Sequence, residues 1–260
     1  MEMQVNKYVS WFFNIIGPVS SLLGVIGVAF TDLFNDIVKT QIIFWLTIAL
    51  VLFLFFRIYL VTKQALNRRY PRGYLPIATF ARYSTSDGKR IQYEIFRHIQ
   101  IKQSFKNSFE HDFYWTGSKL PTVSSNMQKV GVIKEKENDD GQIRNVVPLE
   151  FKETLLYNSC EVVHILMDID DSDEKSEPFL SQTVNEPIKS IHFRVELLHA
   201  KEDYYCKTAN LTCYETAKPK GCKNIISNVK FDNLSKSYST LVVNPKAGYT
   251  YVLSWERPHQ

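Results

Sequence analysis

The stretch QIIFWLTIALVLFLFFRIYLVTKQALNRRYPR, residues 41–72, runs from apolar sequence directly into a cluster of Lys and Arg. No charged residue occurs from position 40 to position 56, and the five residues after Arg57 are again uncharged. A helix of ~20 such residues is long enough to cross the hydrocarbon core of a membrane. We therefore predict a transmembrane helix over residues 41–60.

A second apolar stretch lies closer to the N-terminus, where residues 8–31 contain no charged side chain. This stretch is longer than the apolar core of a secretory signal peptide, and no small-residue cleavage motif follows Phe30. The sequence therefore predicts another transmembrane helix over residues 10–30, so that residues 1–65 form a transmembrane α-hairpin. The alternative, a pair of buried helices in a soluble protein, is disfavoured by uncharged runs of this length.

The charges around the two stretches predict the orientation of the hairpin. The loop between them holds two Asp and one Lys, whereas several Lys and Arg follow the second stretch. Positively charged residues remain on the cytoplasmic side of a membrane, so both termini are expected in the cytoplasm. The basic residues expected at the interface, among the headgroups of the lipid bilayer, are Arg57, Lys63, Arg68, Arg69 and Arg72.

The first stretch contains small and polar residues at helical spacing. Gly17 and Ser21 are four positions apart, as are Ser20 and Gly24, and this spacing lets two helix backbones approach closely. Asn14 adds a polar group that can hydrogen-bond between helices. The sequence predicts that these five residues mediate helix association. Self-association between copies of the chain and packing within one hairpin both stay open.

After the second helix, we expect a basic juxtamembrane linker over residues 66–74 and a cytoplasmic β-rich domain over residues 75–260. The alternation in RIQYEIFRHIQ, residues 90–100, places Ile91, Tyr93 and Ile95 on one face of a strand. The fold class expected for the domain is all-β, an antiparallel sandwich or barrel. The other expected strands cover residues 128–136, 142–151, 161–169, 189–198, 204–214, 225–231, 238–243 and 249–255.

The β-rich domain contains none of the motifs that mark phosphate-binding loops, dinucleotide sites, zinc proteases or serine hydrolases. Its His residues are scattered, and His164, within an apolar strand, is expected in or near the core. His192 and His199 fall on different faces by parity, so they form no ready pair. We therefore expect no catalytic residue, no cofactor and no enzymatic activity, and we interpret the domain as a module for sensing or partner binding.

Three short segments can bind a ligand in principle, but each has a simpler structural explanation. The acidic run over residues 168–174 lacks the glycine and the final glutamate of a calcium loop, so a solvated loop is expected. The aromatic cluster over residues 111–115 can stack on a base or pack into the core. The basic loop with Lys218, Lys220 and Lys223 can meet phosphate groups or simply face water.

The cysteines fit a cytoplasmic domain, which would keep them reduced. The spacings of Cys206, Cys213 and Cys222 match no zinc finger or ribbon, so we predict no metal site, although a site formed by these three in space stays open. Asn210 and Asn233 begin glycosylation sequons, which have meaning only in a secreted eukaryotic domain. The charge asymmetry is the stronger indication of location.

Two N-terminal membrane helices followed by a cytoplasmic β-rich domain, in a chain of 260 residues, resemble the two-transmembrane effectors of bacterial anti-phage defence. Such effectors act in cyclic-oligonucleotide signalling systems or accompany reverse transcriptases in retrons. The resemblance is architectural, covers the whole chain in outline and carries over no ligand-binding residue. It implies a multi-pass protein of the bacterial inner membrane. It also implies a regulatory partner, either a nucleotide-producing enzyme or a complex of reverse transcriptase and nucleic acid.

The leading hypothesis is therefore a membrane effector of an abortive-infection system, which disrupts the inner membrane when its β-domain is triggered. The expected partners are the lipid bilayer, further copies of the chain and the regulatory partner. The alternative is a non-toxic membrane-anchored receptor or scaffold that binds a ligand or protein through the β-domain. Toxicity on expression separates the two hypotheses.

The first testable prediction concerns helix association. Replacing Gly17 and Gly24 together by Leu (Gly17→Leu, Gly24→Leu) should abolish self-association of the first helix, because the added side chains keep two backbones apart. Chemical crosslinking in membranes measures the effect. Unchanged crosslinking of the double variant would show that these glycines do not form the contact.

Overall fold

The computed structural model describes residues 36–113, 115, 117–137, 143–218 and 223–258, together with the helical residues 20, 24 and 27. Most of the predicted first transmembrane helix, including Asn14, Gly17 and Ser21, lies outside the described residues. Ser20 and Gly24 are helical and exposed. The chain divides into two units, Met1–Lys63 and Gln64–Gln260.

Helix α2 covers Asp36–Arg69 and contains the sequence that predicted the second membrane span. Within its segment Ile43–Arg69, the most apolar window has a mean hydropathy of 2.3 and no buried residues, so the helix is long and apolar enough to cross a membrane. It is the one such helix in the described part of the chain, and the two-helix hairpin stays a prediction.

The helix runs past residue 60, where the predicted span ended, and through part of the segment predicted as a linker. The residues after Thr62 include Lys, Gln, Ala, Leu and Arg, which all favour helix. Pro71 then disfavours the helical conformation at the residue before it, and the helix ends at Arg69. Only four residues separate this end from the first strand.

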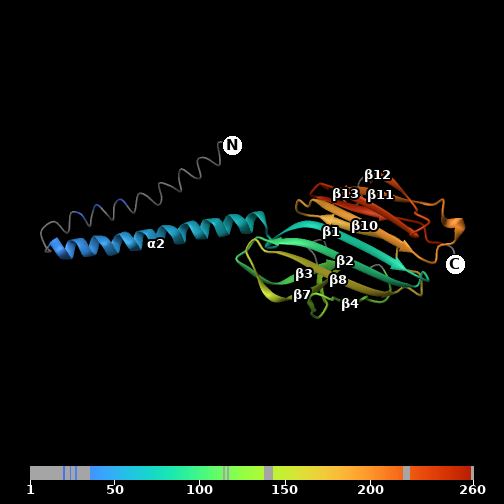
Figure 1. Cartoon of the computed structure of the whole chain (residues 1–260), viewed down its shortest axis with the longest axis horizontal. Helices are drawn as coiled ribbons and strands as arrows, with labels where there is room; N and C mark the ends of the chain where they lie inside the picture. The colour runs from blue at the N-terminus through green and yellow to red at the C-terminus, as the bar shows by residue number, and fades with distance from the viewer. Residues whose placement is uncertain are drawn as a thin grey trace. The chain divides into compact units, whose positions relative to one another are not determined.

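The rest of the chain is a β-domain (Figure 1). Its strands are β1 (Tyr74–Thr85), β2 (Arg90–Ile101), β3 (Phe105–Phe113), β4 (Thr122–Ser124), β5 (Lys129–Val130), β6 (Lys134–Glu137), β7 (Ile143–Leu156), β8 (Cys160–Asp170), β9 (Phe179–Val184), β10 (Ser190–Leu197), β11 (Thr208–Glu215), β12 (Asn224–Lys230), β13 (Ser237–Val243) and β14 (Tyr249–Ser254). A short 3-10 helix, η1, covers Glu202–Tyr204.

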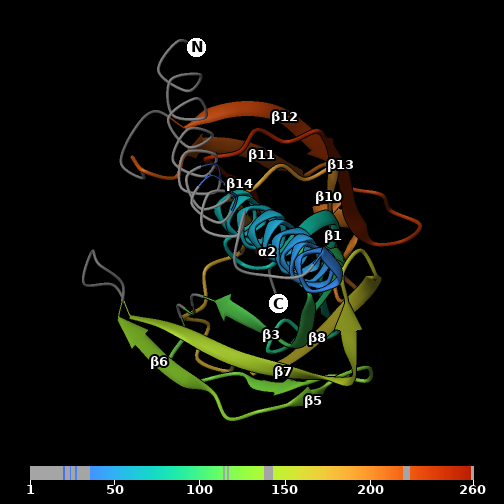
Figure 2. The ribbon, with the colours of Figure 1, turned by 90° about the vertical axis from the view of Figure 1, so that its left-hand side faces the viewer.

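The strands form three sheets. The largest has the order β13-β10-β1-β2-β8-β4, the second has the order β12-β11-β14-β9, and the third has the order β3-β7-β5, with β6 also paired to β7. In Figure 2 the second and third sheets lie on opposite sides of the β-domain. The six-stranded sheet connects them.

One face of the six-stranded sheet carries two hydrophobic cores. Directly paired side chains point to the same face, and one such row contains Phe193, Ala81, Ile95 and Ile165. Phe193 and Ala81 belong to a core shared with β9, β11 and β14, whereas Ile95 and Ile165 belong to a core shared with β3 and β7. The two smaller sheets therefore cover two halves of one inner face.

The coarse prediction of a mostly β soluble domain after an apolar helix is confirmed, but the topology differs from it. The pairing of β1 with β10 is parallel, so the domain is not purely antiparallel. Strands β1, β3, β4 and β9 were not predicted. The strand expected over residues 204–214 begins only at Thr208, because η1 precedes it, and the strand expected over 128–136 is two short strands, β5 and β6.

The second prediction tests the core under the second sheet. Phe193→Ala should lower the free energy of unfolding by about 3–5 kcal/mol, because the side chain is fully buried and a cavity remains. Val243→Ala, at an exposed position of β13, is the matched control and should change it by less than about 0.5 kcal/mol. Urea unfolding of the purified chain in detergent measures both. Equal losses of unfolding free energy in Phe193→Ala and Val243→Ala would contradict the assignment of Phe193 to the core.

Candidate functional site

The two cores meet at a pair of tyrosines. Tyr83 of β1 and Tyr93 of β2 are paired across the strands, and both contact both cores. Burial raises the pKa of Tyr93 to about 12. We call the region around these tyrosines the seam. Polar residues and hollows occur at its two ends, so the seam is where a ligand can reach the inner face.

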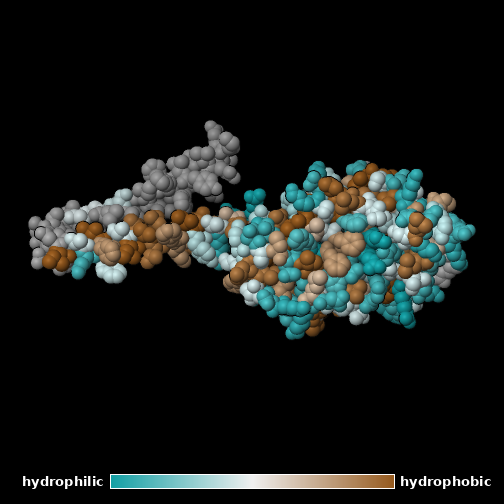
Figure 3. All heavy atoms as spheres, in the orientation of Figure 1, coloured by the Kyte–Doolittle hydropathy of each residue, from teal (hydrophilic) through white to brown (hydrophobic). Residues whose placement is uncertain are grey.

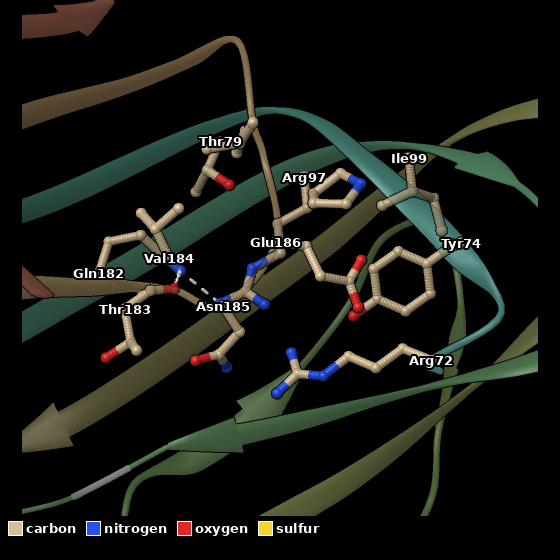
Figure 4. Close-up of a pocket in the computed structure, with 12 residues that line it drawn as sticks. Arg72, Tyr74, Thr79, Arg97, Ile99, Gln182, Thr183, Val184, Asn185 and Glu186 are labelled. Atoms are coloured by element: carbon tan, nitrogen blue, oxygen red, sulfur yellow. Dashed lines mark hydrogen bonds between the residues drawn. The ribbon is translucent and has the colours of Figure 1, made fainter. Parts of the chain in front are cut away.

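The junction pocket lies at the end of the seam where β1 begins. Its polar lining includes Arg72, Tyr74, Arg97, Gln182, Asn185 and Glu186. The side chains of Arg72, Arg97 and Asn185 point toward one hollow, and the carboxylate of Glu186 lies beside Tyr74 (Figure 4). The cavity of about 40 Å³ has room for roughly three water molecules or one carboxylate- or phosphate-sized group.

Arg97 is a charged residue on the apolar inner face. Its neighbours in the same row are Thr79 and Val163. One guanidinium nitrogen, Nη2, donates a hydrogen bond of 3.2 Å to Oε1 of Gln182, and the guanidinium lies 5.9 Å from the ring centre of Phe109. Nε is buried and has no hydrogen-bond partner among the described residues. A buried donor of this kind is costly unless a water or ligand accepts from it.

Arg72 and Glu186 bring opposite charges to the same pocket. Burial tends to lower the pKa of Arg72, but Tyr74, Asp112 and Glu186 together raise it. Burial also raises the pKa of the Glu186 carboxyl, and Arg72 opposes that shift. Oε2 of Glu186 has no hydrogen-bond partner among the described residues. The pocket therefore has both an acceptor and a donor that are not satisfied.

His111 lies near this charge cluster. It is 2% exposed, and neither ring nitrogen has a hydrogen-bond partner among the described residues. Burial, helped by the charges of Arg97 and Arg72 and opposed by Asp112, lowers its pKa to about 3. The imidazole is therefore neutral at physiological pH.

The junction pocket can bind a small oxyanion. Two guanidinium groups supply charged donors, and the amides of Asn185 and Gln182 supply neutral ones. Glu186 would repel an anion unless it were protonated or turned away, so anion binding and the state of Glu186 are coupled. Among the described residues that line the pocket, no nucleophile is paired with a base.

A larger hollow, the distal pocket, lies at the other end of the seam and has a volume of about 340 Å³. Tyr83 and Trp255 form its aromatic part, with ring centres 4.9 Å apart. Its cation, Arg257, already donates to the buried carboxylate of Asp171 at 2.8 Å. The volume suits a small molecule. However, its principal charge is paired with a buried carboxylate, whereas Nε of Arg97 in the junction pocket has no partner among the described residues.

The histidines considered from the sequence are not brought together. His164 is buried, accepts a hydrogen bond from the backbone N–H of Asn126 at 3.1 Å and lies 3.0 Å from Glu94 through Nε2. It is a satisfied structural residue. His192 contacts Ser239 on the outer face of the six-stranded sheet, and His199 lines the distal pocket.

The other segments considered from the sequence have structural roles where they are described. In the acidic run, Asp170 pairs with Lys119 at 2.5 Å and Asp171 pairs with Arg257. In the aromatic cluster, Phe113 and Trp115 pack against the core under the third sheet. Within the described part of the chain, no three His, Cys, Asp or Glu side chains gather as a metal site. Cys206 is exposed and Cys213 is partly buried, while Cys222 and Lys220 lie outside the described residues.

Sequence reasoning missed Arg97, although the signal was present. Arg97 is in phase with Ile91, Tyr93, Ile95 and Ile99, so the alternation that predicted strand β2 also placed a cation on its apolar face. Glu186 and Asn185 lie in the connection between β9 and β10, where no pattern indicates a site. Arg72 was expected among lipid headgroups, and it lines the junction pocket.

No protein-family model matches this chain, and no curated protein matches it. Among solved structures, it is similar to an M1 zinc metallopeptidase from Deinococcus radiodurans, with a TM-score of 0.37 and 6% identity over 70% of this chain and 42% of that chain. It is also similar to a putative protease from Parabacteroides distasonis, with a TM-score of 0.42 and 8% identity over 72% of this chain and 41% of that one. Baculovirus P35 has a TM-score of 0.36 and 9% identity over 72% of this chain and 99% of its own.

This chain thus spans about two fifths of the length of the two peptidases. Likeness at these TM-scores supports no inference about fold or activity. The function has to be argued from the residues themselves.

The third prediction follows from the pKa of His111. In the unfolded chain the imidazole binds a proton below about pH 6.5, whereas the folded state binds one only near pH 3. The unfolded state therefore gains protons first as the pH falls, and His111 should cost about 2 kcal/mol of stability between pH 7 and pH 5.

His111→Phe should remove this loss without destabilising the protein at pH 7, because no hydrogen bond disappears and the ring can still stack on Phe113. His98→Gln, at an exposed position of β2, is the matched control and should keep the pH dependence. Urea unfolding at pH 7 and pH 5 measures both. A pH dependence that persists in His111→Phe would show that the imidazole is already protonated or solvated in the folded state.

Proposed function

We propose that this chain is a membrane effector. Helix α2 anchors it in a bilayer, and the β-domain converts the binding of a trigger at the junction pocket into disruption of that bilayer. The observation that carries the proposal is the position of the pocket in the chain. Two of its residues, Arg72 and Tyr74, come within five positions of the end of the apolar helix at Arg69.

The segment between the helix and β1 is short and hydrogen-bonded, which supports the transmission of a conformational change from the pocket to the helix. The backbone N–H of Gly73 donates to the carbonyl of Tyr70 at 2.8 Å, and that of Lys102 donates to the carbonyl of Gly73 at 2.9 Å. A ligand that moves Arg72 would therefore move backbone that is continuous with the helix. Such a ligand can shift an equilibrium between two states only if it binds one of them more tightly.

The incomplete hydrogen bonding of the pocket supports a binding role. Nε of Arg97 is buried without a partner among the described residues, and an incoming oxyanion can accept a hydrogen bond from it. We propose a small anionic group as the trigger, presented by a free molecule or by a regulatory partner. The proposal assigns no catalytic step to the chain.

The setting we propose is antiviral defence in the inner membrane of a bacterium, with a nucleotide-producing enzyme or a reverse-transcriptase complex upstream. Its support is the resemblance in layout described above, together with the apolar helix and the β-rich domain. Self-association of the first helix would supply the disruptive assembly.

The fourth prediction is a test in an inducible bacterial host, with a potential-sensitive dye and with or without phage infection. The full chain should depolarise the membrane once triggered, and residues 72–260 alone should not. Arg97→Leu should abolish depolarisation, since it removes the buried charge and leaves a side chain suited to the apolar row. Arg90→Leu, at an exposed position of the same strand, is the matched control and should retain activity.

Two outcomes would contradict the proposal in different ways. If the full chain keeps the membrane polarised even with phage present, the chain is a receptor or scaffold and not an effector. If Arg97→Leu depolarises the membrane as the unmodified chain does, the effector function stands and the trigger binds elsewhere, with the distal pocket next to be tested.

A further inference from the structure

Large apolar side chains are exposed at one end of the β-domain. Phe105 is 62% exposed, Leu156 is 64% exposed and Tyr157 is 52% exposed. Phe105 and Leu156 face each other across β3 and β7, and the backbone N–H of Tyr157 donates to the carbonyl of Ser104 at 3.2 Å. The three side chains therefore belong to two adjacent segments, residues 102–106 and 156–159, which we call the tip.

The tip is fastened to the segment that leaves helix α2. Besides the bond from Lys102 to Gly73, Nζ of Lys106 donates to the carbonyl of Arg72 at 3.1 Å. Gly73 has a φ of 75°, a left-handed backbone conformation that favours glycine, and the side chain of Gln103 lies against it. Four residues span at most about 14 Å. The tip thus lies near the end of the apolar helix by chain continuity alone.

The charges of the tip suit an anionic surface. Residues 102–106 and 156–159 contain two Lys and no Asp or Glu, and Arg68, Arg69 and Arg72 precede them in the adjoining chain. Nζ of Lys102 lies 5.8 Å from the ring centre of Tyr157, so cation and aromatic ring share one site. Lys and aromatic side chains together are typical of protein surfaces at the headgroup level of a bilayer.

Figure 3 shows apolar side chains at the end of the β-domain where β1 begins. We propose that the tip docks on the bilayer, with Phe105, Leu156 and Tyr157 entering the boundary between headgroups and acyl chains and the two lysines meeting anionic headgroups. The inference rests on the membrane anchoring in the proposed function. It adds a second membrane contact, which holds the β-domain against the surface.

Photocrosslinking of the full chain tests the docking directly. The photoreactive residue p-benzoylphenylalanine is placed at position 105 or 157, and the chain is reconstituted in vesicles of phosphatidylcholine and phosphatidylglycerol. Position 45, an exposed residue of the apolar helix, reports membrane anchoring. Position 234 is the matched control, because Leu234 is 98% exposed and lies in the turn between β12 and β13, at the other end of the domain.

Lipid adducts detected by mass spectrometry at positions 45, 105 and 157, and none at 234, are the expected result. Adducts at position 45 without adducts at 105 and 157 would overturn the docking and leave anchoring intact. No adduct at position 45 would overturn anchoring and, with it, the docking. Adducts between two copies of the chain at position 105, or lipid adducts at position 234, would also overturn the docking.

A second arm tests the lysines. Lys102→Gln with Lys106→Gln should lower the adduct yield at position 157 at least threefold in anionic vesicles. In vesicles of phosphatidylcholine alone, the chain with native lysines should show a similar reduction in adduct yield at position 157. Equal yields in all three samples would overturn the electrostatic part of the docking.

Discussion

The placement of β1 is the constraint on which the rest of the β-domain depends. This strand is the first after the apolar helix, and it is paired with β10 on one side and β2 on the other. It therefore lies in the middle of the six-stranded sheet, where Ala81 contributes to one core and Tyr83 contacts both. Every layer of the domain is positioned relative to a strand that begins four residues after the apolar helix.

Sequence patterns predicted the elements whose signal is local. The apolar helix follows from the absence of charge over residues 40–56, and strands β2, β8 and β10 follow from alternation or from a continuous apolar run. Strand β1 carries Pro76 near its start, and the parallel pairing with β10 joins residues far apart in the chain. No local pattern encodes such a pairing, so an antiparallel topology was the natural expectation and was wrong for this pair.

The candidate site was less predictable than the fold, for a physical reason. Arg72, Arg97 and Glu186 come from the junction after α2, from a strand interior and from a connecting loop, and only the tertiary fold brings them together. Of these, only Arg97 carried a local signal, as a cation in phase with apolar residues. The more conspicuous histidine, His164, was expected in or near the core, and it is a buried residue with its hydrogen bonds made.

The parallel pairing of β1 and β10 also affects how the chain is made. Ala78 pairs with Ser190, which is synthesised 112 residues later (190 − 78). The backbone groups along one edge of β1 therefore stay unpaired until then. At ~5–20 residues per second, that delay is about 6–22 s. During this time β1 exposes unpaired backbone groups on the side that β10 will cover. Unpaired strand edges are prone to aggregate, so the late synthesis of β10 lengthens the period in which a nascent chain exposes one.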